Sequence, residues 1–105
     1  MRWNRNELPC LTVWKNTQAL EDGYVTGIEP ATNYPNFKSF ERQHERVKVL
    51  PPGGRWECSW SIEVFDSKEA VTGVLAEIAK LQAHGRETVH RTPQPRFSPF
   101  GVPGA

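Results

Sequence analysis

A single carboxylate, Glu29, ends an apolar stretch and is followed at once by proline in the segment GYVTGIEPATNYPN, residues 23–36. Because a residue before proline is biased toward extended backbone, Pro30 holds Glu29 in a β conformation. Gly27, two positions earlier, suggests a bulge or a close approach to the backbone. A general base must stay within hydrogen-bond reach of its proton, and a rigid backbone at residues 27–30 would hold the Glu29 carboxylate in place. Glu29 is therefore a candidate base, with a solvated charge at a strand end as the ordinary alternative.

The cysteines and histidines form no metal-binding pattern. The two cysteines lack metal-ligand spacing, and no pair of histidines has the spacing of zinc ligands. The first ten residues, MRWNRNELPC, lack the apolar stretch of a signal peptide. We therefore expect free thiols at Cys10 and Cys58 in a reducing cytoplasm rather than a disulfide. We also expect no metal and no cofactor.

Composition excludes two classes of partner. The chain has 105 residues, the size of one domain, and its 37% hydrophobic residues suffice for one core. Thirteen basic and twelve acidic residues give a net charge of +1, which argues against a protein that binds nucleic acid by neutralising phosphates. The mean hydropathy is −0.61, and no apolar run approaches the roughly 18 residues that cross a bilayer. We expect a soluble, cytoplasmic protein without nucleic-acid or membrane partners.

Short strands are predicted on both sides of the candidate base. CLTVWK at 10–15 is β-branched and aromatic, and YVTGIE at 24–29 forms the second predicted strand. The polar stretch 16–23 connects them. A long loop follows Glu29 and is expected to hold one helical turn near 37–42, then a third strand at 45–50, and a break at the PPGG of 51–54.

The clearest periodicity lies in RWECSWSIEVF, residues 55–65. Alternate positions carry apolar side chains: Trp56, Cys58, Trp60, Ile62 and Val64. One face of a long strand is therefore predicted to be buried, with Trp56 and Trp60 in the core. A strand with one buried and one solvent-exposed face is typical of an antiparallel sheet or sandwich. The fold class is therefore predicted to be mainly β.

Helical spacing replaces the alternation after residue 66. An apolar stripe predicts an amphipathic helix over about 67–84, packed against the sheet, with Asp66 as its cap and Gly85 at its end. Residues 1–85 are expected to form one β-rich domain closed by this helix. Residues 86–105 are rich in proline and are expected to form a flexible tail. So few strands leave open sheet edges, which favour association with a partner.

The segment 8–82 resembles the C-terminal part of the aldose 1-epimerase (galactose mutarotase-like) family. The resemblance lies in a strand ending in Glu29-Pro30, a loop with Asn and Pro, and VKVLPPGG at 47–54 leading into the last long strand. It implies a β-supersandwich, in which antiparallel sheets curve around a sugar cleft. The implied activity is that of an isomerase that interconverts the α and β anomers of a sugar or sugar phosphate.

The resemblance also implies roles for individual residues. Glu29 matches the base that takes the proton of the anomeric hydroxyl. Beside it, Trp14 would stack on the sugar ring or pack in the sheet, and Asn33 would hydrogen-bond a hydroxyl. Arg42 would contact a sugar phosphate or remain a solvated charge.

The family's acid histidine lies upstream of the Glu-Pro motif, whereas His44, His84 and His90 all follow Glu29. The chain thus resembles a C-terminal fragment, a truncated form or a small stand-alone descendant, and a complementary N-terminal chain is one expected partner. The alternative function is a non-catalytic carbohydrate-binding module or a protein-interaction module that uses a sheet edge. A homo-oligomer remains open as well.

Overall fold

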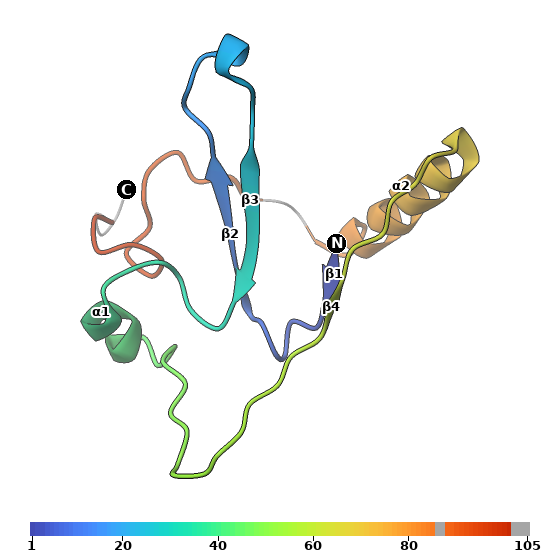
Figure 1. Ribbon diagram of the computed structural model, residues 1–105. Helices are drawn as coiled ribbons and strands as arrows, with labels where there is room; N and C mark the ends of the chain where they lie inside the picture. Colours follow the sequence, from blue (N-terminus) through green and yellow to red (C-terminus); the bar gives the residue numbers. More distant parts are fainter. Residues whose placement is uncertain (86–87, 102–105) are drawn as a thin grey trace.

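The centre of the structure is an antiparallel hairpin of β2 (Cys10–Lys15) and β3 (Thr26–Ala31), seen in a computed structural model that describes residues 1–85 and 88–101 (Figure 1). The predicted strand at 10–15 is confirmed. The second strand begins two residues later than predicted and runs through Pro30 to Ala31. The connecting loop contains the short 3-10 helix η1 (Leu20–Asp22) and turns at Gly23, whose φ of 83° suits glycine.

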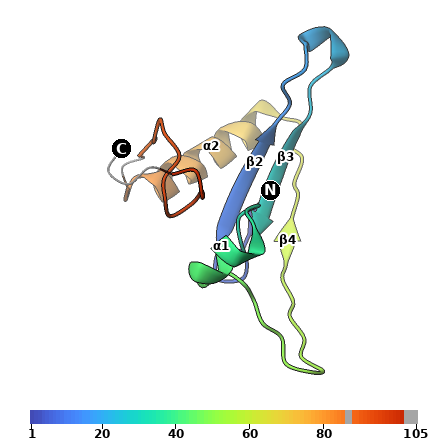
Figure 2. The ribbon, with the colours of Figure 1, turned by 90° about the vertical axis from the view of Figure 1, so that its left-hand side faces the viewer.

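A second, smaller sheet pairs β1 (Arg2–Trp3) with β4 (Trp60–Ser61), also antiparallel. The long strand predicted over 55–65 is therefore wrong in its extent, because only two of its residues pair with a neighbour. In both views the chain between α1 and β4 runs apart from the hairpin (Figures 1 and 2). The alternating apolar side chains consequently meet no second layer among the described residues.

Burial contradicts the core role predicted for that segment. The exposed fractions are 38% for Trp56, 57% for Trp60, 65% for Ile62 and 89% for Val64. Alternation in the sequence indicates which face would be covered, but it does not supply the covering layer. The alternation of apolar residues is thus present in the sequence, but the face that these residues form is exposed to solvent.

Helix α1 (Lys38–Gln43) confirms the helical turn expected after β3. The strand predicted at 45–50 is wrong, since these residues join no sheet and Glu45 has a φ of 59°. The predicted break at PPGG is a turn in which the Gly54 amide donates to the Pro51 carbonyl at 2.8 Å. Gly53, with a φ of 72°, supplies the left-handed residue of this turn.

Helix α2 (Lys68–Gln82) confirms the helix predicted from the apolar stripe. Its cap is Ser67, whose Oγ accepts from the Ala70 amide at 3.2 Å, so the cap predicted at Asp66 is wrong by one residue. Leu75 and Leu81 are 60% and 73% exposed, and the predicted packing of the stripe on a sheet is not found among residues 1–85 and 88–101. Figure 1 shows α2 lying to one side of the hairpin.

Ion pairs join α2 to the N-terminal strand. The Arg2 guanidinium donates to both carboxylate oxygens of Glu77 at 2.7 Å and to Glu63 at 3.1 Å. All three side chains are about half exposed, and such surface pairs contribute little to stability. The contact fixes where α2 lies more than it strengthens the fold.

The C-terminal segment contacts the loop between β3 and α1. Phe97 meets the Tyr34 ring edge-on at 5.5 Å, and its carbonyl accepts from the Asn36 side chain at 3.0 Å. The flexibility of the whole stretch 86–105 stays a prediction, and its residues 86–87 and 102–105 lie outside the described part of the chain.

Buried side chains are few and lie near the start of the hairpin and in α1. Among the described residues, the buried ones are Leu8, Cys10 and Glu41. The Trp3 indole donates to the Leu8 carbonyl at 3.1 Å and closes the turn that leads into β2. Two antiparallel sheets are compatible with a mainly β fold. No helix of the described residues combines the length and apolar character that a bilayer crossing needs.

Candidate functional site

The hairpin register brings the candidate base and the candidate stacking residue onto one face. Thr12 lies opposite Glu29, and Trp14 lies opposite Gly27. Side chains directly opposite each other in an antiparallel ladder project to the same side, and every second residue shares that side. Glu29 and Trp14 therefore stand as diagonal neighbours on the same face of β2 and β3.

Gly27 makes room for the carboxylate beside the indole. A Cβ placed on Gly27 would lie 2.6 Å from Glu29 Oε1 and 3.4 Å from Trp14 Cβ. Glu29 thus folds back along its own strand into space that only glycine leaves empty. The close approach that the sequence suggests at Gly27 is confirmed, and the group that approaches is Glu29 itself.

A hollow of about 320 Å³ lies at the loop end of the hairpin, and its lining includes Trp14 but not Glu29. Trp14 is half exposed there, and Tyr24 contributes a second aromatic ring. The lining residues combine flat apolar and hydrogen-bonding groups: Trp14, Asn16, Gln18, Asp22, Gly23, Tyr24 and Val25. Such a mixture suits a small polar ligand with an apolar ring face.

Hydrogen bonds fix the loop around this hollow. Asn16 donates to the Gly23 carbonyl at 3.1 Å and accepts from the Gln18 amide at 3.2 Å. From the sequence, 16–23 was predicted only as a connection, so Gln18 and Asp22 were missed. The signal was present, because a polar loop that directly follows a tryptophan-bearing strand can place its side chains beside that ring.

The other two predicted binding residues lie beyond β3. Asn33 donates to the Tyr34 carbonyl at 2.8 Å and accepts from the Thr32 hydroxyl at 3.3 Å. It lines a separate hollow of about 350 Å³, together with Glu41 and two lysines. Arg42 is exposed on α1. The structure therefore groups Trp14 with Glu29 and places Asn33 and Arg42 in the loop and helix that follow.

A buried carboxylate, Glu41, organises that second region and was missed from the sequence. Its side chain is 1% exposed and accepts from the Tyr34 amide at 3.1 Å and the Asn36 side chain at 2.7 Å. Arg46 donates to both of its oxygens, at 2.6 and 2.9 Å. The Arg46 guanidinium, opposed in part by burial, lowers the pKa of Glu41 from 4.5 to about 2.

Arg46 extends the cluster to the C-terminal segment and to two rings. It donates to the Arg96 carbonyl at 2.9 Å and lies 5.2 Å from the centre of the Tyr34 ring and 5.8 Å from that of Phe40. Burial, with a contribution from Cys10, raises the pKa of Tyr34. Because the polar groups of the Glu41–Arg46 pair bind one another, we interpret this cluster as structural, holding α1, the loop and the C-terminal segment together.

His44 is held at the end of α1. Its Nδ1 lies 3.0 Å from the Phe40 carbonyl, and its ring stacks at a tilt on the Phe40 ring with centres 4.3 Å apart. The ring is thus held at the helix end.

Comparison with known proteins gives one family match. Residues 1–64, more than half of the chain, match the model of a family described as a domain of unknown function, DUF4432. The matched stretch includes both hairpin strands, Glu29, Trp14 and the Glu41–Arg46 pair. Neither a curated protein nor a solved structure matches the chain.

Proposed function

The chain belongs to the DUF4432 family, and we propose that this member recognises the anomeric centre of a sugar or sugar phosphate, with Glu29 as general base. The matched residues 1–64 overlap the segment that resembles the aldose 1-epimerases. The overlap includes the Glu29-Pro30 strand end and the loop after it. We propose on this basis that the family shares the galactose mutarotase-like β-supersandwich.

The observation that carries the proposal is the shared face of Glu29 and Trp14. A sugar ring presents C–H groups on its faces and hydroxyls at its rim. The half-exposed Trp14 indole offers the flat apolar surface, and the Glu29 carboxylate beside it offers a strong acceptor for a hydroxyl. The hollow next to Trp14 adds Gln18 and Asp22 as partners for further hydroxyls.

The reaction assigned to this face begins with proton transfer from the anomeric hydroxyl to Glu29. The bond between C1 and the ring oxygen then breaks, and an acid delivers a proton to that oxygen. Rotation about the bond between C1 and C2 and reversal of the same steps give the other anomer. All three histidines of the given sequence follow Glu29, and the proposal assigns the acid to a complementary β-rich segment.

The open apolar face of 56–64 supports the need for such a segment. Trp60, Ile62 and Val64 are more than half exposed. An alternating strand of this kind is stabilised when a second layer covers its apolar side. We propose that the assembly is cytoplasmic, a compartment in which free thiols such as those of Cys10 and Cys58 persist.

A second candidate is a non-catalytic module that binds carbohydrate or protein through its sheet edges. Exposed apolar side chains beside these edges favour contact with a partner, because Val13 and Ile28 pair across the strands on the opposite face of the hairpin and are 50% and 51% exposed. Proline at position 13 would remove one backbone N–H of β2. Loss of a dimer in Val13→Pro by light scattering, with the dimer retained in Glu29→Gln, would favour this candidate.

The catalytic proposal is tested by anomer exchange. The rate at which α and β forms of glucose and galactose interconvert is measured by NMR with wild type, Glu29→Gln and the surface control Glu69→Gln. The acid is proposed to come from a complementary β-rich segment, so the exchange is measured with that segment present. Under these conditions we expect wild type and control to accelerate exchange, and Glu29→Gln to lose about 100-fold of that acceleration. Equal acceleration by Glu29→Gln would overturn the base role. Absence of acceleration by wild type in that assembly would assign the non-catalytic module.

A further inference from the structure

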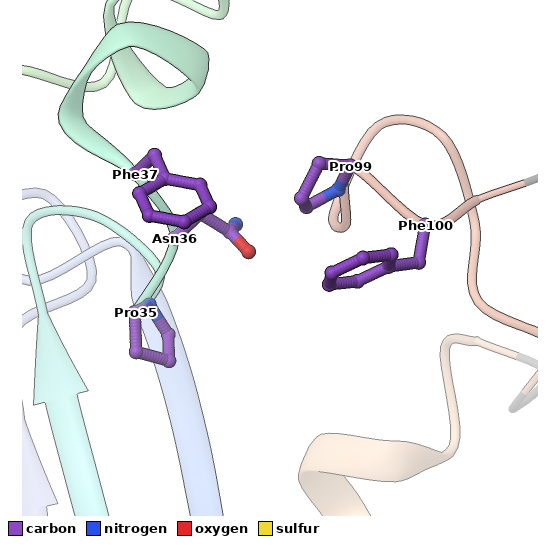
Figure 3. A pocket seen from close by; sticks show the side chains of 5 residues that line it. All are labelled: Pro35, Asn36, Phe37, Pro99 and Phe100. Atoms are coloured by element: carbon purple, nitrogen blue, oxygen red, sulfur yellow. The ribbon is translucent and has the colours of Figure 1, made fainter.

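A further cavity lies between the β3–α1 loop and the C-terminal segment. This cavity of about 390 Å³ has Pro35, Asn36 and Phe37 on one wall and Pro99 and Phe100 on the other (Figure 3). Phe37 is 75% exposed and Phe100 is 79% exposed, so both rings are open to solvent. We call this cavity the aromatic slot.

The two walls are tied to each other behind the slot. Asn36 donates across to the Phe97 carbonyl at 3.0 Å, and Arg46 donates to the Arg96 carbonyl at 2.9 Å. The edge-on contact of Tyr34 and Phe97 adds an apolar link. The separation of the walls is therefore set by bonds outside the slot, and a ligand need not assemble it.

A tight turn presents the second wall. The Gly101 amide donates to the Ser98 carbonyl at 3.0 Å, and the Phe100 amide donates to Ser98 Oγ at 3.2 Å. A Cβ on Gly101 would overlap backbone atoms of Gln94 and Pro95. Only glycine fits there without shifting the turn, so Gly101 holds Phe100 in place from outside the slot.

The slot offers one defined polar group, the side-chain oxygen of Asn36. The Asn36 Nδ2 donates to Glu41 Oε1 at 2.7 Å and to the Phe97 carbonyl at 3.0 Å. Both partners are acceptors, which fixes the orientation of the amide. Within the described residues nothing donates to Oδ1, and the Asn36 side chain projects between the two walls (Figure 3).

We propose that the aromatic slot binds a small planar aromatic molecule that carries one N–H or O–H donor, such as an indole. The flat ring would lie between Phe37 and Phe100, and its donor would meet Asn36 Oδ1. A proline-rich peptide fits less well, because proline has no N–H to give to this acceptor. A sugar fits less well, since several hydroxyls would face apolar walls without partners.

The proposal is tested by titrating the full chain with indole and following the Asn36 side-chain amide and the Phe100 and Gly101 backbone amides by NMR. We expect saturable shifts at these groups. 1-Methylindole, which lacks the donor, should bind about fivefold more weakly. Phe100→Ala should weaken indole binding about tenfold. Gly101→Ala, which leaves both rings intact, should weaken it as well.

Phe65→Ala is the matched control, because Phe65 is an exposed phenylalanine far from the slot in sequence. It should bind indole like wild type. Equal binding by Phe100→Ala, or no saturable shift up to the solubility of indole, would overturn the site. Equal affinity for 1-methylindole would overturn the role of Asn36. If these NMR signals shift with protein concentration in the absence of indole, the slot binds a tryptophan side chain of a second copy of the chain, and the small-molecule site is overturned.

Discussion

The carboxylate of Glu29 takes the space that a side chain on Gly27 would fill, with Oε1 2.6 Å from the position of that missing Cβ. Since Trp14 lies directly opposite Gly27, the same gap brings the carboxylate close to the indole-bearing residue. One glycine therefore determines whether a candidate base and a candidate sugar platform can share a ligand.

Gly27→Ala is expected to move the Glu29 carboxylate and weaken sugar binding about tenfold while the hairpin stays folded. The group that must move is the end of an exposed side chain, so the free energy of unfolding should change by no more than about 1 kcal/mol. Binding is measured from galactose-dependent shifts of the Trp14 indole in NMR spectra.

Gly73→Ala serves as the control for that experiment. It lies in α2, where a new Cβ meets nothing within 4 Å. It should raise stability by about 1 kcal/mol and leave the Trp14 titration unchanged. Galactose binding by Gly27→Ala at the wild-type affinity would show that the position of the carboxylate does not matter.

Removing the charge of Glu41 should destabilise the α1 region strongly. Glu41→Gln leaves Arg46, whose side chain is 14% exposed, without its ionic partner, and loss of one member of a buried pair costs about 3 kcal/mol. Urea unfolding measures this loss. Glu45→Gln, an exposed neighbour, should stay within about 0.5 kcal/mol of wild type. Similar effects from the two variants would contradict a structural role for the cluster.

The same pair should make stability depend on pH in the acid range. The pKa of Glu41 is about 2 in the folded chain and 4.5 as its ordinary value. A lowered pKa means that the stabilising contribution is complete above about pH 4.5 and is lost as the pH falls toward 2. Unfolding free energies from urea titrations at pH 7 to 2 should show this slope in wild type. An identical slope in Glu41→Gln would refute the assignment.

The cap of α2 gives a prediction that separates neighbouring residues. Ser67→Ala removes the acceptor of the Ala70 amide and should cost about 1 kcal/mol of helix stability. Asp66→Ala removes no cap and should have less effect. Circular dichroism during thermal unfolding measures both variants. A larger loss of thermal stability in Asp66→Ala than in Ser67→Ala would show that Asp66, the residue favoured by the sequence pattern, is the cap.

The sequence predicted local structure well where short-range forces decide it. The strand at 10–15, the turn at 51–54 and the helix at 68–82 follow from β-branched residues, Pro-Gly chemistry and an apolar stripe. It failed over 55–65, because burial of an alternating strand depends on a second layer that the local sequence does not supply. The exposed Trp60 is the direct result.

The candidate site divides in the same way. Glu29 was singled out because Pro30 and Gly27 are visible local signals, and Trp14 was named from the family resemblance; the hairpin register places both on one face, and their roles stay predictions. Glu41 was missed because its burial depends on Arg46 and on the distant carbonyls of the C-terminal segment. A carboxylate in a charge-rich stretch is ordinarily solvated, and only three-dimensional contacts distinguish this one.

Recognition of the anomeric hydroxyl by Glu29 is the central proposal for this protein. The direct measurement compares the affinity for galactose with that for 1,5-anhydrogalactitol, which lacks this hydroxyl, in wild type and Glu29→Gln. We expect wild type to prefer galactose about tenfold, as a charge-assisted hydrogen bond implies, and Glu29→Gln to lose most of that preference. Equal affinity of the wild-type chain for both compounds would contradict the account.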